Sequence, residues 1–293
     1  MKHRDLIYKA VVTATIFFCI STLATTDAQF IKANAVATTT DKVPLALINT
    51  LKDKQLILLG EIHGTNEMPA YAGKIIEALA LNQKVLVGIE YPIDIQSQID
   101  VFMKTGDTSQ LRETFFFQEP DYHSGRGSQA MLRLLDSLRS YSNVEVFCFD
   151  IPLSYKGKTR DTDMAVNILA KLQSENYPQA VLYSGNIHSR LTIGTPWNPT
   201  TQNMGAEILR LSNNHYNIDN TDNLVFRANE GSSWSCMQDD TGQFKCTTQV
   251  WQPSNTAYAT AVNLDYYFLQ EPFMTDGHKN SFFIRKVSAS NPF

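Results

Sequence analysis

The feature of this sequence that most constrains its fold is an alternation of two apolar patterns after about residue 40. Short apolar runs of strand length cover residues 56–59, 85–89, 144–149, 180–183 and 224–226. Between them, apolar residues repeat at helical spacing over residues 72–79, 95–102, 131–138, 165–172 and 204–211. Asn66 is a candidate cap for the first helix, and the second is expected to end near Gly106. The alternation predicts an α/β fold, a mostly parallel sheet flanked by helices on both faces.

Length and composition agree with a single domain of this class. The chain has 293 residues, of which 43% are hydrophobic and 18% charged, which is ample apolar material for one large core. Residues 46–293 are therefore predicted to form a single α/β domain. The formal net charge is −4, and no run of Lys and Arg is interleaved with aromatic residues. The sequence therefore predicts no nucleic-acid partner.

The N-terminal segment has the pattern of an export signal. Basic residues near the start precede an apolar stretch over residues 10–23, and small residues precede a plausible cleavage point after Ala28. We predict a signal peptide over residues 1–28, a flexible leader over residues 29–45, and a periplasmic or secreted mature protein. The alternative is an uncleaved membrane anchor. The apolar stretch is shorter than the roughly 20 residues of a spanning helix, so no stable span is expected after cleavage.

Beyond residue 230 the sequence changes to Trp, Cys, Thr and turn residues. We predict that residues 230–275 form an inserted, β-rich lobe of hairpins and loops, and that residues 282–284 form a late strand that returns to the sheet. Cys236 and Cys246 flank a segment containing the turn-forming residues 240–242, so the two thiols can face each other across a hairpin. In an oxidising compartment a disulfide between them is expected.

Polar residues follow four of the predicted strands at the point where each strand ends. They are Glu61 and His63 after the first strand, Glu90 after the second, Asp150 after the third, and Asn186 and His188 after the fourth. In an open parallel sheet the carboxyl ends of the strands line one edge, and ligands bind there. The sequence therefore predicts that these side chains gather at one crevice.

Each of these residues also has a structural interpretation. Glu90 could be a solvated loop residue, Asp150 could form a turn, and His188 could donate one structural hydrogen bond. Glu61 and His63 are harder to explain in this way, because glycines on both sides let the backbone turn tightly and approach a ligand. We therefore centre the candidate site on these two residues.

Other catalytic motifs are absent from the sequence. It has no nucleophile elbow, no Walker loop, no dinucleotide-binding glycine motif after the first strand, and no His-Glu-x-x-His zinc motif. Among the remaining histidines, His123 lies between Tyr122 and Ser124 in a glycine-containing loop and is the best candidate for substrate contact. His215 and His278 lie in loop-like sequence and are expected to be exposed.

Six short motifs in residues 56–230 resemble, in the same order, those of the erythromycin esterase family. They are Gly60-Glu61-Ile62-His63-Gly64-Thr65, Glu90-Tyr91-Pro92, Phe149-Asp150, Arg160-Asp161-Thr162-Asp163-Met164-Ala165, Asn186-Ile187-His188 and Met204-Gly205. That family belongs to a superfamily with iron-regulated haem-binding lipoproteins and the Tiki metalloproteases. The predicted export signal and the segment after residue 230 lie outside the resemblance.

The resemblance implies a hydrolase that directs water onto an ester, lactone or amide carbonyl of a small-molecule substrate, and the N-terminal signal predicts that this hydrolase is exported. His63 is the implied general base, Glu61 or Glu90 would hold its imidazole in the right tautomer, and Arg160 or His188 would stabilise the oxyanion. The predicted substrate-binding residues are Asp150, Asp161 and Asn186 of these motifs, together with His123 from the glycine-containing loop. Asp161 would either cap a helix or orient Arg160.

Three alternatives remain open. Glu61, His63, Glu90 and His188 could instead hold a divalent metal ion, which lowers the pKa of its bound water to about 7, in a metal-assisted hydrolase or a Tiki-like metalloprotease. The chain could bind haem or iron like the lipoproteins of the superfamily. It could also be an exported protein with a degenerate site. No cofactor is certain from the sequence.

Overall fold

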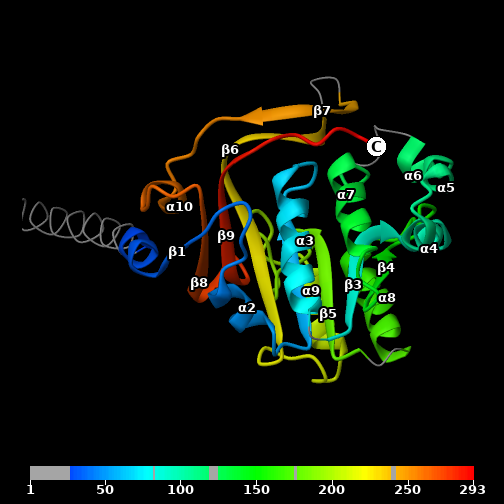
Figure 1. Cartoon of the computed structure of the whole chain (residues 1–293), viewed down its shortest axis with the longest axis horizontal. Coiled ribbons are helices and arrows are strands. Elements are labelled where there is room, and N and C mark those ends of the chain that lie inside the picture. The colour runs from blue at the N-terminus through cyan, green and yellow to red at the C-terminus, as the bar shows by residue number, and fades with distance from the viewer. Residues whose placement is uncertain (1–26, 82, 119–124, 175–176, 239–241) are drawn as a thin grey trace, which may run out of the picture.

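The computed structural model describes residues 27–293 apart from residues 82, 119–124, 175–176 and 239–241. In this part of the chain, nine strands form one sheet in the order β1-β8-β9-β6-β2-β5-β3-β4, with β7 paired to the distal part of β6 (Figure 1). The strands are β1 (Val36–Ala37), β2 (Leu56–Glu61), β3 (Val85–Pro92), β4 (Val144–Asp150), β5 (Gln179–Gly185), β6 (Thr221–Gln238), β7 (Phe244–Trp251), β8 (Tyr266–Thr275) and β9 (His278–Val287). All pairings from β4 to β9 are parallel, while β8, β1 and β7 add antiparallel pairs. The predicted fold class is confirmed.

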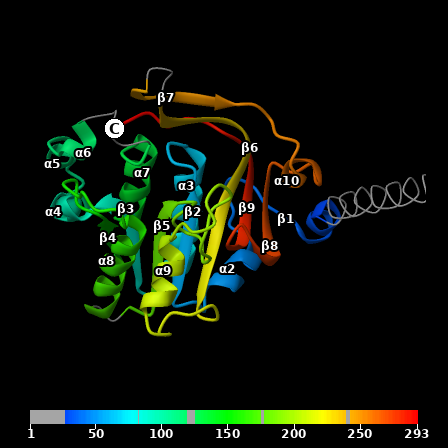
Figure 2. The same ribbon diagram turned by 180° about the vertical axis from the view of Figure 1, so that it is seen from behind.

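Helices cover both faces of this sheet (Figures 1 and 2). One face carries α2 (Leu45–Leu51), α3 (Glu67–Ala80) and α7 (Gln129–Leu138), and the other carries α8 (Arg160–Ser174) and α9 (Met204–Leu211). Beside β4 lie the 3₁₀ turn η1 (Ile93–Ile95), α4 (Gln96–Thr105), α5 (Ser109–Arg112) and α6 (Phe115–Gln118), and α10 (Ala257–Thr260) lies beside β8. Every predicted helix is present.

The continuous apolar runs of the central strands follow from burial on both faces. In β2, Ile57 and Leu59 enter the core beneath α3, whereas Leu56 and Leu58 enter the core beneath α8 and α9. All four side chains are fully buried. A strand sandwiched in this way needs apolar residues at successive positions rather than at alternate ones.

The helix ends are fixed by different local groups. Gly106 ends α4 in the left-handed conformation, with φ 76°, as its position in the sequence predicts. The Ser128 hydroxyl accepts a hydrogen bond from the Met131 amide and so caps α7. Asn66 stands at the start of α3 but makes no side-chain cap; its amide group instead donates to the Ala289 carbonyl. The prediction of a cap at Asn66 is therefore corrected, because the C-terminal segment binds that side chain.

Residues near the described N-terminus pack on the sheet. Residues 27–34 are helical, and Ile31 is buried against Tyr267 and Phe283. β1 then pairs with β8. The segment expected to be a flexible leader, residues 29–45, therefore contains a packed helix and an edge strand. Most of the predicted signal peptide lies outside the described residues, and no described helix has the length and hydropathy to cross a membrane.

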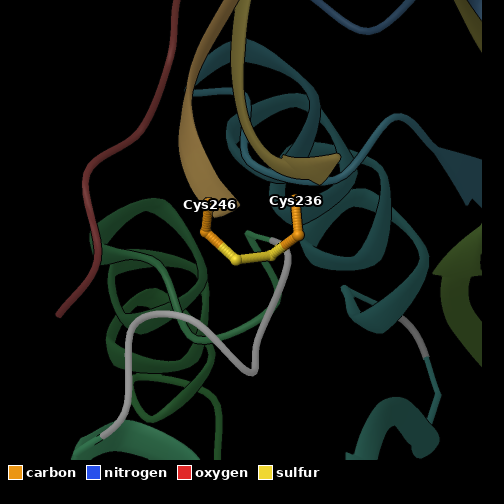
Figure 3. The surroundings of a disulfide bond; sticks show 2 residues. All are labelled: Cys236 and Cys246. Atoms are coloured by element: carbon orange, nitrogen blue, oxygen red, sulfur yellow. A yellow bond between two sulfur atoms is a disulfide. The ribbon is translucent and has the colours of Figure 1, made fainter. Parts of the chain in front are cut away.

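The β-rich segment after residue 230 is an extension of the sheet. β6 continues far beyond the predicted strand 224–226 and pairs with β7 as a hairpin that crosses above the carboxyl ends of the parallel strands (Figures 1 and 2). Cys236 and Cys246 face each other in the register of this hairpin and form the predicted disulfide (Figure 3). β8, which was expected to belong to the lobe, instead returns to the sheet antiparallel to β9.

Candidate active site

The carboxyl ends of β2, β3, β4 and β5 bring the predicted polar residues together. Glu61 ends β2 directly opposite Gly185 of β5, and Glu90 lies in β3. Asp150 ends β4 beside the last residue of β3. His63 follows β2, and His188 follows β5. The crevice expected from the strand ends is therefore present in the fold.

His63 is held between two buried carboxylates. Its Nδ1 lies 2.8 Å from Glu61 Oε1, and its Nε2 lies 3.4 Å from Glu90 Oε2. The other Glu61 oxygen accepts a hydrogen bond from the Tyr183 hydroxyl. Glu61 is 2% exposed and the His63 side chain 21% exposed, so one side of the imidazole remains accessible.

Two glycines make this arrangement possible. Gly64 has φ 75°, and a Cβ there would lie 2.0 Å from the Trp234 carbonyl oxygen, because the hairpin backbone packs directly on this loop. A Cβ at Gly185 would lie 2.9 Å from His63 Nε2. Side chains at either position would displace the hairpin or the imidazole.

An ion network lies behind His63. Glu90 Oε1 accepts from Arg160 Nη2 at 2.7 Å, and Glu90 Oε2 accepts from the Gly185 amide at 2.7 Å. Asp150 accepts from Arg160 Nε at 3.0 Å and Nη2 at 2.8 Å. Arg126 also forms an ion pair with Asp150 and donates to the Glu90 carbonyl oxygen. Asp150 therefore fixes two guanidinium groups, and its predicted contact with substrate stays a prediction.

Arg126 is a site residue that the sequence alone did not identify. The glycine-containing loop of residues 122–127 is the sequence signal nearest to it, and in that loop the sequence favours His123 as the substrate contact. His123 lies outside the described residues. Arg126 is 36 positions from Glu90 and 24 from Asp150 in the chain, so only the fold brings the three together.

His188 is fixed at both ring nitrogens. Its Nδ1 lies 2.7 Å from Asp161 Oδ1, and its Nε2 lies 3.1 Å from Arg160 Nη1. Because a guanidinium can only donate, Nε2 accepts and Nδ1–H donates to Asp161. The same Asp161 oxygen accepts the Met204 amide at the start of α9. Asp161 therefore orients His188 and caps α9, so of its two predicted roles the structure shows a helix cap and not the orientation of Arg160.

Buried opposite charges set the protonation states of the site. Burial alone would lower the pKa of His63, but the Glu90 charge and the hydrogen bond to Glu61 raise that pKa to about 9. Burial would raise the pKa of Glu90, yet the nearby His188, His63 and Arg126 hold it well below its usual value. Burial opposes the charge of Arg160 in the same way, and Glu90 and Asp150 raise its pKa. His63 is therefore an imidazolium at neutral pH.

A cavity of about 320 Å³ opens onto the two histidines. It is lined by Glu61, Ile62, His63, Gly185, Asn186, Ile187, His188, Ser233 and Ser235. Asn186 lines the cavity, and its backbone amide also donates to the Glu61 carbonyl. Its contact with a substrate stays a prediction. Ser233 and Ser235 come from the hairpin, whose serines showed no pattern in the sequence that marked them as site residues.

The donor atoms of the site are engaged with one another. Among the residues that the structure describes, no group of three or more His, Cys, Asp or Glu side chains is arranged to hold a metal ion. Both oxygens of Glu61 and of Glu90 accept hydrogen bonds, and both nitrogens of His188 have partners. Two guanidinium groups also occupy the site. The four predicted metal ligands therefore do not fit a divalent cation in this arrangement.

The two other histidines that the structure describes, His215 and His278, lie outside the cavity lining. His215 is exposed, as expected. His278 is 2% exposed, which corrects the expectation of a surface position. Its Nε2 contacts the Ser189 hydroxyl, and burial together with Arg227 and Arg190 lowers its pKa to about 3. The loop-like sequence around His278 gave no sign that this residue begins β9.

Among solved structures with the same fold, three align with this chain over most of its length. An erythromycin esterase, EreC, in its open conformation aligns with a TM-score of 0.66 over 87% of this chain and 97% of its own, at 10% sequence identity. A Bacillus cereus protein aligns with a TM-score of 0.64 over 92% and 99%, at 13% identity. A succinoglycan biosynthesis protein aligns with a TM-score of 0.64 over 93% and 99%, at 11% identity.

These likenesses extend over nearly the whole of each chain, although the sequences have diverged widely. No family model and no curated protein matches the sequence. The alignment with the esterase covers more of the chain than residues 56–230, which carry the motif resemblance. The chain therefore has the erythromycin esterase-like fold.

Proposed function

We propose that this protein is a hydrolase in which His63 is the general base that directs water onto an ester, lactone or amide carbonyl. The observation that carries the proposal is the position of the His63 imidazole, between Glu61 and Glu90 and open to a cavity. His188 borders the same cavity, but Asp161 and Arg160 engage both of its nitrogens. His63 is thus the better placed base.

The tautomer of His63 suits this role. A neutral ring that donates Nδ1–H to Glu61 leaves the Nε2 lone pair free to take a proton from water. The hydroxide oxygen then bonds to the carbonyl carbon, and the carbonyl π electrons move to the oxygen. Collapse of the tetrahedral intermediate breaks the bond to the leaving group, which takes the proton from His63. Base catalysis of this kind contributes about 10²–10⁴-fold to the rate.

Two neighbours complete the proposed mechanism. Glu61 stabilises the imidazolium that forms when His63 accepts the proton. Arg160 retains its charge because Glu90 and Asp150 raise its pKa, and its side chain is one-third exposed. We assign it to stabilising the negative charge on the carbonyl oxygen, while His188 Nε2 helps to hold its guanidinium in place.

The proposed substrate is a small molecule, and the proposed location is periplasmic or secreted. The cavity volume lies at the lower end of the roughly 300–1,000 Å³ usual for ligand pockets, so it suits the acyl part of a substrate. The disulfide suits an oxidising compartment. Macrolide hydrolysis is suggested only by the description of the esterase with the same fold. We do not propose metal or haem binding, because the donors are engaged within the site.

The test is a screen of the purified protein against chromogenic esters, lactones and peptides. We expect His63→Ala to lower kcat at least 100-fold while leaving the thermal unfolding curve cooperative. His215→Ala is the matched control, since it removes an exposed histidine outside the cavity lining. Treatment with chelator should leave turnover unchanged. Absence of turnover on every substrate, or full turnover by His63→Ala, would refute the proposal.

A further inference from the structure

The hairpin of β6 and β7 supplies one wall of the cavity. Ser233 and Ser235 lie two positions apart on β6, so their side chains are on the same face of the strand, roughly 7 Å apart. Both line the cavity that contains His63 and His188. Ser233 is 3% exposed and Ser235 half-buried. Two serines therefore line the cavity of the catalytic candidates from an element outside the parallel strand ends.

The backbone of this hairpin is anchored to the loop that contains His63. The Trp234 amide donates to the Gly64 carbonyl at 2.9 Å, and the hairpin packs so closely there that only glycine fits at Gly64. The Ser232 hydroxyl accepts the Ala289 amide at 3.0 Å. These contacts fix the strand on both sides of Ser233, so its position relative to His63 is set by backbone contacts.

A covalent bond holds the distal side. The disulfide joins Cys236, which directly follows Ser235, to Cys246 on the paired strand. Ser233 and Ser235 thus lie between an anchored residue and a cross-linked one. A wall held in this way keeps its polar groups in place before a ligand arrives, which reduces the entropy lost on binding.

We infer that Ser233 and Ser235 are substrate-binding residues that select an acyl group bearing a polar oxygen near the scissile carbonyl. The inference rests on the proposed hydrolytic function and adds the substrate class. A hydroxyl can donate to an ether, hydroxyl or carbonyl oxygen, and a hydrocarbon acyl chain offers it no partner. An apolar acyl chain would leave both hydroxyls desolvated and unpaired, which disfavours its binding.

The experiment compares two esters of similar size, p-nitrophenyl methoxyacetate and p-nitrophenyl butyrate. The quantity measured is the ratio of their kcat/KM values, normalised to the ratio for alkaline hydrolysis, which removes the difference in intrinsic reactivity. We expect the wild-type ratio to favour the methoxyacetate and the Ser233→Ala/Ser235→Ala double variant to lower it about 2- to 10-fold. The loss should arise mainly from the methoxyacetate.

Two controls test whether the effect belongs to the hydroxyls. Thr248→Ala removes an exposed hydroxyl from the other face of the same hairpin and should leave the ratio unchanged. Ser235→Thr keeps the hydroxyl and should retain most of the preference. A wild type that cleaves esters with a ratio that the double variant preserves would overturn the inference while leaving the hydrolase proposal intact. A wild type that cleaves no ester, lactone or peptide of the wider panel would instead remove the hydrolase proposal and this inference together.

Discussion

At the scale of single residues, the site is defined by a charged imidazole between carboxylates. Glu61 contacts one ring nitrogen of His63 and Glu90 lies near the other, and neither carboxylate is free to move away, because Tyr183 and Arg160 hold them. This arrangement orients the ring well but favours its protonated form. The same contacts that position the proposed base therefore hold it inactive at neutral pH.

The pH dependence of turnover follows from this conflict. Since only neutral His63 can accept a proton, kcat/KM should rise with pH and level off above about 9, the pKa of His63. Glu61→Gln removes one of the charges that raise this pKa and should move the midpoint to lower pH. Initial rates across pH 6 to 10 measure both. A profile that stays flat from pH 6 to 10 would contradict the assignment of His63 as base.

Protein stability should change with pH in the same range but in the opposite direction. The pKa of His63 is about 9 in the folded chain and about 6.5 in the unfolded chain, so its contribution is fully present below pH 6.5 and is lost as pH rises through 9. The free energy of unfolding should fall there by at most about 1.4 kcal/mol per pH unit. In denaturant titrations, His63→Gln should flatten this alkaline limb of the curve of unfolding free energy against pH. An unchanged limb would show that other groups cause it.

The buried His278 should give the curve of stability against pH a second limb, on the acidic side. Its pKa of about 3 in the folded chain lies below the unfolded value of about 6.5, so it stays neutral when folded while the unfolded chain takes up a proton. The stability it contributes is present above pH 6.5 and is lost as pH falls toward 3. The same titrations should therefore place maximal stability between these two limbs, near pH 6.5.

At the scale of elements, the hairpin of β6 and β7 links the disulfide to the wall of the cavity. Its disulfide closes a loop with a sequence separation of 10 residues, next to a serine of the cavity wall. The parallel strands supply His63 and its carboxylates, whereas the hairpin supplies the opposite wall. A site assembled from two such elements needs both to be held firmly.

Removing the disulfide tests this dependence. Cys236→Ser combined with Cys246→Ser should lower the free energy of unfolding by about 2–4 kcal/mol if the hairpin unfolds with the domain. It should also raise KM more than it lowers kcat, because the wall loosens while His63 keeps its contacts. Denaturant unfolding and steady-state kinetics measure the two effects, with Thr248→Ala as the hairpin control. Unchanged stability and KM would mean that backbone contacts alone fix the wall.

At the scale of the whole molecule, the last residues join elements that are far apart in the sequence. The C-terminal segment runs across the ends of α3 and α7 (Figure 1). The Ser290 amide donates to the Gly64 carbonyl at 2.8 Å, and its hydroxyl accepts the Ala130 amide at 2.9 Å. The Phe293 ring packs on Phe117, with ring centres 5.7 Å apart. This segment therefore connects the His63 loop to α7.

Deleting residues 288–293 should destabilise the entire domain. The deletion leaves the Gly64 carbonyl and the first amides of α7 without these partners, and each lost hydrogen bond contributes about 0.5–1.5 kcal/mol. We expect the free energy of unfolding to fall by about 2–5 kcal/mol, and by less in Ser290→Ala, which removes one of these bonds. Thermal and denaturant unfolding provide the measurement. Equal stability of the deletion variant and the wild type would show that the segment is dispensable.

The sequence by itself determined the fold class and the location of the site. Continuous apolar runs, separated by segments whose apolar residues repeat at helical spacing, specify strands that are buried on both faces. Parallel strands in one sheet place their carboxyl ends at the same edge. That is why Glu61, His63, Glu90 and His188 could be grouped before their distances were known. The turn residues between Cys236 and Cys246 likewise sufficed to predict the disulfide, because a hairpin brings its flanking residues together.

Only the tertiary structure decided what those residues contact. Arg126 reaches Asp150 from a loop, Asp161 binds His188 rather than Arg160, and two hairpin serines line the cavity. Such contacts join side chains from separate elements, and local periodicity carries no information about the packing that brings them within hydrogen-bonding distance. The protonation of His63 belongs to the same class, because its pKa depends on burial and on charges that the fold alone places beside it.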